Sequence, residues 1–192
     1  MTPTWLTAFL DLAPAEHERA VAFWSAVTGY AVSAPRGDEA EFATLDPATG
    51  DAFLKVQRLA GGASRVHVDV NVPDPDAAAD EAVALGATVA LRSPHGFVVM
   101  ASPGGLTFCF VDHPAHLRPL PVEWPGGNTS LVDQGCLDIP PAIFEAECEF
   151  WRALTGWELR YSAVATEFAN LLRPPRSPLR VLLQRLDHDP DD

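Results

Sequence analysis

One apolar strand carries two side chains that could move a proton. In residues 66–72, valine alternates with His67, Asp69 and Asn71, so these three share the face opposite the valines. The unperturbed pKa of histidine lies near neutrality, which suits a general base, and Asp69 lies two residues along on the same face. The spacing therefore predicts either an acid–base pair of His67 and Asp69 or a simple hydrogen-bonded pair.

Cys109 is a third residue with possible chemistry. A cysteine nucleophile needs a neighbouring base and a lowered thiol pKa, whereas a small buried cysteine that packs on its neighbours is the commoner case. The chain has three cysteines, Cys109, Cys136 and Cys148, and no Cys-x-x-Cys pair. This odd, widely spaced set predicts free thiols rather than a disulfide framework, and hence a cytoplasmic protein.

Charge and composition limit the class of partner. Of 192 residues, 13 are Lys or Arg and 26 are Asp or Glu, which gives a formal net charge of −13. Nucleic acids and anionic membranes need a basic surface, so we expect neither as a partner. The acidity suits solubility or a cationic ligand. We expect no signal peptide at residues 1–8, and no stretch approaches the roughly 20 apolar residues that span a bilayer.

A repeated unit organises the elements that must position these residues. Five short motifs recur in the same order, with an offset of 127 residues that slips by one near Glu41. The matches are Leu10-Asp11-Leu12 with Leu137-Asp138-Ile139, Phe23-Trp24 with Phe150-Trp151, Thr28-Gly29-Tyr30 with Thr155-Gly156-Trp157, Glu41-Phe42-Ala43 with Glu167-Phe168-Ala169, and Gln57-Arg58-Leu59 with Gln184-Arg185-Leu186. Residues 5–59 and 132–186 are therefore two copies of one unit.

Each copy is predicted to consist of a strand, a helix and three further strands. In the first copy, residues 5–12 have the pattern of a strand, and Pro14 is expected at the first helical position, where proline is tolerated. Gly29 is expected to end the helix. A stripe with the i, i+3, i+4, i+7 spacing of a buried helical face is formed by Ala20, Phe23, Trp24 and Val27.

Residues 65–112 have the same order of elements with different residues. Asp74 is predicted to cap the helix, Pro75 to be its first residue and Gly86 to stop it. The sequence thus predicts an α+β chain of three β-α-β-β-β modules. We expect a complete domain over residues 1–112 (modules 5–59 and 65–112), a Pro/Gly-rich linker over 113–131, and a single module with an acidic tail over 132–192.

These modules resemble the vicinal oxygen chelate superfamily. The resemblance is carried by "AVAFWSAVTG" on the first helix, "RVHVDVNVPDPDAAADEAVALGATV" at the start of the second module and "SPGGLTFCFV" near its end. The superfamily includes glyoxalase I, extradiol dioxygenases and bleomycin-resistance proteins, and the chain is most similar to its glyoxalase-like domains. The resemblance implies a mixed sheet curled into a cup, with the helices on the convex side and the binding site inside.

The resemblance allows strand alternation to assign the cup lining. If the apolar strand faces pack on the helices, the alternate residues point into the cup. Besides the candidate catalytic residues His67 and Asp69, we expect it to contain Thr7, Phe9, Asp11, Phe53, Lys55, Gln57, Asn71, Thr107 and Cys109. Two interpretations of this lining stay open: it surrounds a ligand cavity, or its polar residues hydrogen-bond only to one another.

The resemblance also provides a test for a metal. Metal-dependent relatives hold a divalent ion with inward residues, usually His or Glu, on the first and last strands of both modules. His67 is the only position retained. Thr7 stands at the first-module histidine, Cys109 at the second-module carboxylate, and Phe53 or Lys55 at the first-module one. We therefore expect no cofactor, with a divalent metal as the lesser alternative.

Two functions stay open, and the sequence does not decide whether the chain is an enzyme. The first is a glyoxalase-like lyase, isomerase or dioxygenase that acts on a small molecule in the cup. The second is a metal-free binding protein of the bleomycin-resistance kind that sequesters a cationic aromatic compound, which the net charge of −13 favours.

The third module is predicted to need a partner. One module alone forms half a cup with exposed strand edges, which proteins usually cover. We expect a homodimer in which this module pairs with that of a second chain, because a two-fold dimer is the simplest closed arrangement. Alternatively, the module packs on its own domain.

Overall fold

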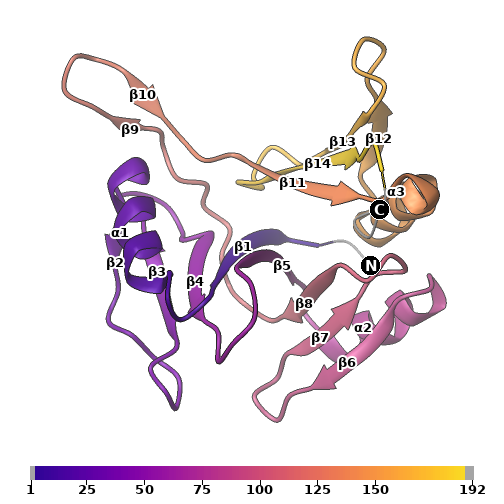
Figure 1. The fold of residues 1–192 in the computed structure, drawn as a ribbon, viewed down its shortest axis with the longest axis horizontal. Helices are drawn as coiled ribbons and strands as arrows, with labels where there is room; N and C mark the ends of the chain where they lie inside the picture. The colour runs from indigo at the N-terminus through magenta and orange to yellow at the C-terminus, as the bar shows by residue number, and fades with distance from the viewer. Residues whose placement is uncertain (1–2, 189–192) are drawn as a thin grey trace.

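The computed structural model describes residues 3–188 and contains an eight-stranded and a four-stranded sheet (Figure 1). The first module comprises β1 (Trp5–Leu12), α1 (His17–Thr28), β2 (Ala31–Val32), β3 (Phe42–Asp46) and β4 (Leu54–Arg58). The second comprises β5 (Arg65–Asn71), α2 (Pro75–Ala84), β6 (Thr88–Arg92), β7 (Val98–Ala101) and β8 (Thr107–Val111). The third comprises β11 (Gln134–Ile139), the short η1 (Pro141–Ile143), α3 (Phe144–Thr155), β12 (Glu158–Tyr161), β13 (Phe168–Leu172) and β14 (Arg180–Arg185). The predicted α+β fold of β-α-β-β-β modules is confirmed.

The first two modules form one continuous sheet around a central pair of strands. The strand order is β2-β3-β4-β1-β5-β8-β7-β6. β1 and β5 pair antiparallel, with Ala8 opposite Val68. Each also pairs in parallel with the last strand of its own module, β1 with β4 and β5 with β8. The first and last strands of both modules therefore lie side by side, where their alternate residues can share one site.

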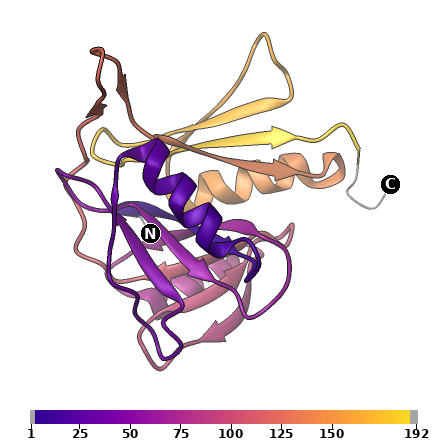
Figure 2. The same cartoon turned by 60° about the vertical axis from the view of Figure 1, so that its left-hand side comes forward.

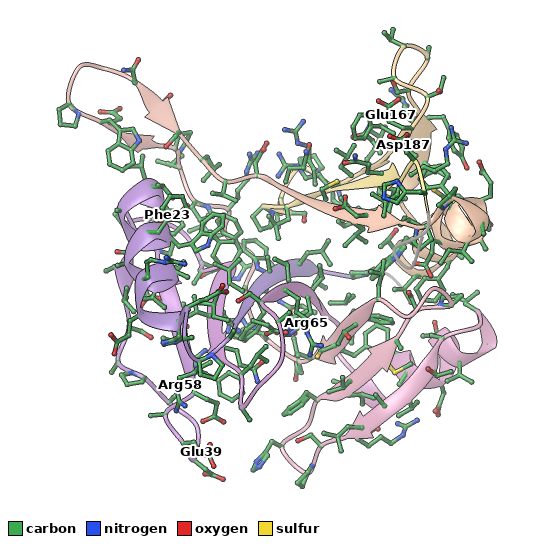
Figure 3. The ribbon with its side chains drawn as sticks, viewed as in Figure 1. Phe23, Glu39, Arg58, Arg65, Glu167 and Asp187 are labelled. Carbon is green, nitrogen blue, oxygen red and sulfur yellow. The ribbon has the colours of Figure 1, made fainter. Side chains whose placement is uncertain are left out.

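The first helix differs from its prediction in both its start and its buried face. It begins at His17 rather than Pro14, with Glu16 at the N-cap, and ends as expected at Gly29, which has a φ of 70°. Figure 3 labels Phe23 on α1. Phe23 is 57% exposed and Val27 44% exposed, so the prediction that they are buried is wrong. The physical reason is that β11 and β14 also approach the convex face of the sheet, which α1 does not cover alone.

The second helix agrees with its prediction. Asp74 is the N-cap and its Oδ1 accepts a hydrogen bond from the backbone N–H of Ala77 at 3.0 Å, with Pro75 following as the first residue. The helix ends at Ala84, two residues before Gly86. α1 and α3 have 12 residues each and α2 has 10. Among residues 3–188, no helix is long and apolar enough to cross a membrane.

The segment over residues 113–131 contains a small hairpin of β9 (Val122–Glu123) and β10 (Thr129–Ser130). The segment is also attached to the first module, because the Asp51 carboxylate accepts hydrogen bonds from the backbone N–H groups of His116 at 2.7 Å and Leu117 at 2.8 Å. The expected linker therefore has ordered structure and contacts of its own.

The third module packs on the second through α3, which lies between the two sheets (Figure 2). Phe108 of β8 contacts Phe150 and Trp151, with ring centroids 5.9 and 5.2 Å apart. The fully buried Glu147 accepts hydrogen bonds from the backbone N–H of Gly104 and from Trp151 Nε1. Within the described residues, β11 pairs only with β14, and the homodimer expected to complete this module stays a prediction.

Candidate functional site

A cavity of about 450 Å³ lies on the concave face of the eight-stranded sheet. Its lining comes from both of the first two modules, and seven of the residues predicted from strand alternation belong to it. These seven are Phe9, Asp11, Gln57, His67, Asp69, Thr107 and Cys109. The cavity gives the predicted residues a shared space in which a small molecule could be bound.

His67 lies between two carboxylates at the base of this cavity. Its Nδ1 is 2.9 Å from Asp11 Oδ2, and its Nε2 is 3.4 Å from Asp69 Oδ1. Its ring stacks on Phe9, opposite it in the β1–β5 register, with centroids 4.8 Å apart and planes 6° from parallel. The ring orientation is therefore fixed by contacts on both nitrogens and on one face.

The two carboxylates determine the charge of His67. Burial by itself lowers the pKa of the imidazole, but hydrogen bonds to Asp11, Asp69 and Cys109 outweigh it and raise the pKa to about 11. In the protein alone, His67 is an imidazolium at neutral pH. Arg65 Nε lies 3.1 Å from the same Asp11 oxygen, which gives this carboxylate a second cationic partner.

Cys109 lies across from Asp69 in the parallel pairing of β5 and β8. Burial raises the pKa of its thiol, and Asp69 raises it further, although His67 opposes the change. A thiol with a raised pKa is a weak nucleophile. The structure thus supports Cys109 as a ligand or packing group rather than as an activated nucleophile.

His67, Asp69 and Cys109 each place one potential metal ligand atom within 4.8 Å of the other two, and all three residues are buried. Asp11 on Nδ1 leaves Nε2 as the nitrogen that faces Asp69. A metal-binding histidine commonly has this arrangement, with a carboxylate on its second nitrogen. One imidazole, one carboxylate and one thiolate suit a divalent ion such as zinc. The donor set fits a metal, contrary to the expectation of no cofactor.

This cluster does not follow the ligand pattern implied by the family resemblance. That pattern draws on both modules, whereas all three donors here belong to β5 and β8. Thr7, at the first-module histidine position, is buried and lies opposite Asp69 in the register. The first module contributes Asp11, which contacts His67 rather than facing the donor cluster.

Four residues predicted to line the cup lie outside this cavity: Thr7, Phe53, Lys55 and Asn71. Phe53 is fully buried and packs edge-on against Tyr30, with centroids 6.3 Å apart. Asn71 is 1% exposed and its amide atoms have no hydrogen-bond partner in the described structure. Lys55 is half-buried beside the cavity, with Nζ 5.4 Å from the centroid of the Phe9 ring.

Several lining residues are absent from the sequence-based prediction, although some carried a readable signal. Arg65 lies two residues before His67 on β5 and opposite Asp11, so extending the alternation by one step identifies it. Val99 is opposite Cys109 and Phe42 is opposite Gln57, so alternation in the neighbouring strands identifies both. The remaining residues, Arg36, Leu59, Leu91, Phe97 and Val111, come from loops and strand ends or complete the walls.

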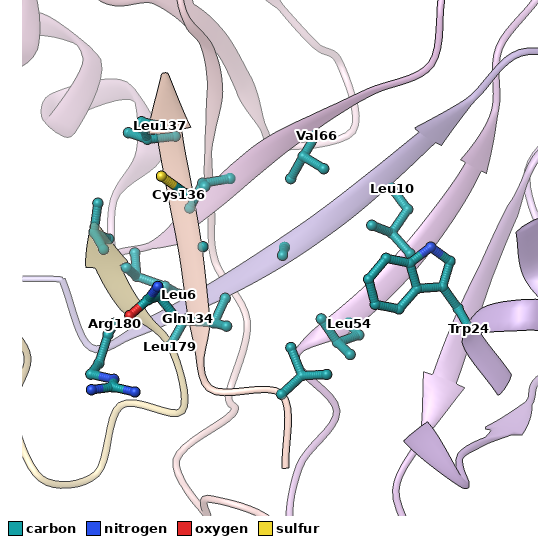
Figure 4. A pocket seen from close by; sticks show the side chains of 15 residues that line it. Leu6, Leu10, Trp24, Leu54, Val66, Gln134, Cys136, Leu137, Leu179 and Arg180 are labelled. Atoms are coloured by element: carbon teal, nitrogen blue, oxygen red, sulfur yellow. The ribbon is translucent and has the colours of Figure 1, made fainter. Parts of the chain in front are cut away.

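A second cavity, of about 180 Å³, lies on the convex side between the eight-stranded sheet and β11 and β14 (Figure 4). Trp24, Leu10 and Leu137 contribute to its apolar walls. Val66, expected to pack on a helix, is 54% exposed and lines this space. Its one arginine, Arg180, is paired with Asp133 at 2.9 Å. The convex cavity therefore lacks the convergent titratable groups of the concave one.

Comparison with known proteins identifies the family and the fold. A family model described as "Glyoxalase-like domain" matches residues 7–111, which is more than half of the chain. No curated protein matches the sequence.

Solved structures share the fold over nearly the whole chain. A variant of 4-hydroxymandelate synthase from Streptomyces coelicolor is 16% identical, with a TM-score of 0.65, covering 96% of this chain and 63% of that one. The 2,2',3-trihydroxybiphenyl 1,2-dioxygenase of Sphingomonas wittichii is 15% identical, with a TM-score of 0.63, covering 100% and 71%. Homoprotocatechuate 2,3-dioxygenase of Arthrobacter globiformis is 16% identical, with a TM-score of 0.59, covering 97% and 60%. The chain therefore spans about two thirds of the length of these proteins, and the likeness concerns the fold alone.

Proposed function

The chain belongs to the glyoxalase-like domain family of the vicinal oxygen chelate superfamily, and on this premise we propose that it is an enzyme. Its active site is the concave cavity of the eight-stranded sheet, and its substrate is a small molecule. Its reaction belongs among the lyase, isomerase and oxygenase reactions of this superfamily. His67, Asp69 and Cys109 are assigned to a divalent metal ion, and Asp11 to the orientation of His67.

The observation that carries this proposal is the convergence of three different donor atoms within 4.8 Å at the cavity. The three residues come from two adjacent strands, and Asp11 holds His67 with Nε2 turned to Asp69. Three protein ligands beside an open cavity are typical of catalytic metal sites, which leave a position for substrate or water.

The residues around the cluster have separable tasks. Asp11 accepts the Nδ1–H of His67, and Arg65 balances the charge of Asp11 from the cavity side. The side chains of Phe97 and Val99 form apolar walls that limit water near the donors. A bound divalent ion would supply a Lewis acid that polarises an oxygen of the substrate.

The alternative of a metal-free protein that sequesters a cationic aromatic compound receives no support from the site. Arg36 and Arg65 line the cavity and Lys55 lies beside it. The overall charge of −13 is therefore not reflected in a purely acidic binding surface.

Metal binding tests the proposal directly. Protein stripped with a chelator is loaded with Zn²⁺ or Co²⁺, desalted and subjected to elemental analysis, with one ion per chain as the expected result. The Co²⁺ form is expected to show a thiolate-to-metal absorption band, which Cys109→Ser removes. Asp11→Asn is expected to weaken metal affinity by about 10- to 100-fold, because it no longer orients the ligating imidazole.

Cys136→Ser is the matched control. Cys136 is exposed on β11, which belongs to the four-stranded sheet, and it does not line this cavity. It is expected to retain both the ion and the thiolate band. A wild-type protein that retains no ion after desalting contradicts the proposed metal site, as does a Co²⁺ band that survives Cys109→Ser.

A further inference from the structure

We propose that the molecule bound in the cup is an aromatic carboxylate, whose carboxylate group is held by Arg36 and Lys55. This inference rests on the proposed function only in taking the concave cavity as the binding site. It assigns the substrate class and two binding residues, neither of which follows from the metal cluster.

Lys55 is a cation that forms no ion pair with a described residue, although the Asp69 carboxylate is close enough to favour its charge. It lies on β4, opposite Phe9 of β1 and Thr44 of β3. Its Nζ is 5.4 Å from the centroid of the Phe9 ring, which is a cation–π contact. Among the described residues, no ion pair includes Lys55.

Arg36 brings a second cation to the same side of the cavity. Its Nη1 donates a hydrogen bond to Thr44 Oγ1 at 2.9 Å, and Thr44 is the cross-strand neighbour of Lys55. Arg36 also forms no ion pair with a described residue, and it lines the cavity. Since a guanidinium presents several donors in one plane, it is suited to bind a carboxylate through two hydrogen bonds.

The two cations disfavour each other in the ligand-free protein. Burial lowers the pKa of Lys55, Arg36 lowers it further, and only Asp69 opposes the change. The pKa of nearby His113 is lowered first by burial and then by Lys55, with a smaller contribution from Arg36. Placing like charges together costs stability, and such a cost is typically retained where a ligand of opposite charge binds.

A third cation, on the cavity wall, provides an internal contrast. Arg65 has a carboxylate partner, Asp11, at 3.1 Å. The chain has twice as many acidic as basic residues, 26 against 13, yet none of the described carboxylates lies within ion-pair distance of Arg36 or Lys55. The proposed carboxylate would give both cations an ion-pair partner that the described residues do not supply.

The rest of the cavity wall indicates the body of this molecule. Phe9 lies between the cationic side and the donor cluster, since it contacts both Lys55 and His67. Phe42 meets Phe9 edge-on, with centroids 6.2 Å apart, and Phe97 and Val99 line the cavity too. Aromatic walls of this kind favour a planar apolar ring. An aromatic ring bound beside Phe9 would place the carboxylate of the molecule at Arg36 and Lys55 and the opposite end of the molecule near His67.

The test uses the whole chain after chelator treatment, so that no metal ion attracts the carboxylate. Benzoate, phenylacetate and 3-phenylpropanoate are titrated by calorimetry or ligand-observed NMR beside their uncharged amides. Wild-type protein is expected to bind at least one acid about tenfold or more tightly than its amide, the range of charge-assisted hydrogen bonds. Lys55→Met and Arg36→Gln are expected to remove this preference.

Arg92→Gln is the matched control, because Arg92 pairs with Asp80 at 2.6 Å on the outer side of the second module and does not line the cavity. It is expected to retain the preference. Lys55→Met is expected to keep or raise the midpoint temperature of unfolding, which separates lost binding from lost folding. The inference is overturned if none of the three acids binds, if acids and amides bind equally, or if both cavity variants retain the preference.

The same proteins separate this inference from the proposed function. If wild-type protein prefers acids but holds no metal, the metal-dependent function fails while the carboxylate site stands. If it holds one metal but shows no preference for acids, the carboxylate site fails while the metal assignment stands.

Discussion

Replacing His67 with alanine is expected to lower the free energy of unfolding of the metal-free protein by about 3–5 kcal/mol, because it removes one partner of a buried charged network. Asp11 and Asp69, which are 1% and 5% exposed, would lose the imidazolium between them. Arg65 pairs with Asp11, and among the described residues Asp69 has no ion-pair partner besides His67. Urea unfolding near neutral pH measures the loss, and a change below about 1 kcal/mol contradicts the network.

The pH dependence of this loss has a definite sign. The pKa of His67 is raised from 6.5 to about 11 in the folded chain. The stabilisation from His67 is therefore fully present below the unfolded pKa of 6.5 and disappears as the pH rises towards 11. The difference in stability between wild type and His67→Ala is expected to have its full size at about pH 6.5 and to shrink progressively from there into alkaline buffer. A difference that grows with pH would contradict the assignment of His67 as an imidazolium.

The second large effect is expected at the junction of the second and third modules. Glu147→Ala is expected to cost about 2–4 kcal/mol, because each unpaired buried donor costs about 1–3 kcal/mol. The donors are the backbone N–H of Gly104 and Trp151 Nε1. Chemical unfolding measures the cost, and protection of the Gly104 amide from hydrogen exchange is expected to fall as well.

Two companion variants define what this loss means. Glu149→Ala is the control, because Glu149 pairs with Arg152 on the exposed side of the same helix and exposed pairs contribute about 0–1 kcal/mol. Glu147→Gln keeps an acceptor oxygen and is expected to recover part of the stability. If Glu147→Ala and Glu149→Ala unfold alike, Glu147 does not hold the modules together.

The fold was predictable because its signals are local and repeated. Residues 5–12 and 66–72 read as strands on their own, and Asp74-Pro75 marks the start of a helix. The error at α1 has a different origin. Phe23 and Val27 have the spacing of a buried face, but periodicity cannot tell which face another module will approach. β11 and β14 come from more than 100 residues further along the chain and share the convex side.

The candidate site was predictable in its faces but not in its distances. Alternation placed His67, Asp69 and Cys109 on one side of the sheet, yet a sequence does not state the register of β5 against β8. That register brings Asp69 opposite Cys109 and turns three separate residues into one donor cluster. Arg36 lies in a loop after β2, where no periodicity applies. A single isolated β-bridge pairs it with Phe42.

The two halves of the central sheet bring different groups to the cavity and its edge. The three donor atoms belong to β5 and β8, whereas Arg36 and Lys55 belong to the first module. A substitution that alters which molecule is selected therefore need not displace the atoms that react with it. A gene built from duplicated modules can in this way change its specificity in one copy while the other copy conserves the chemistry.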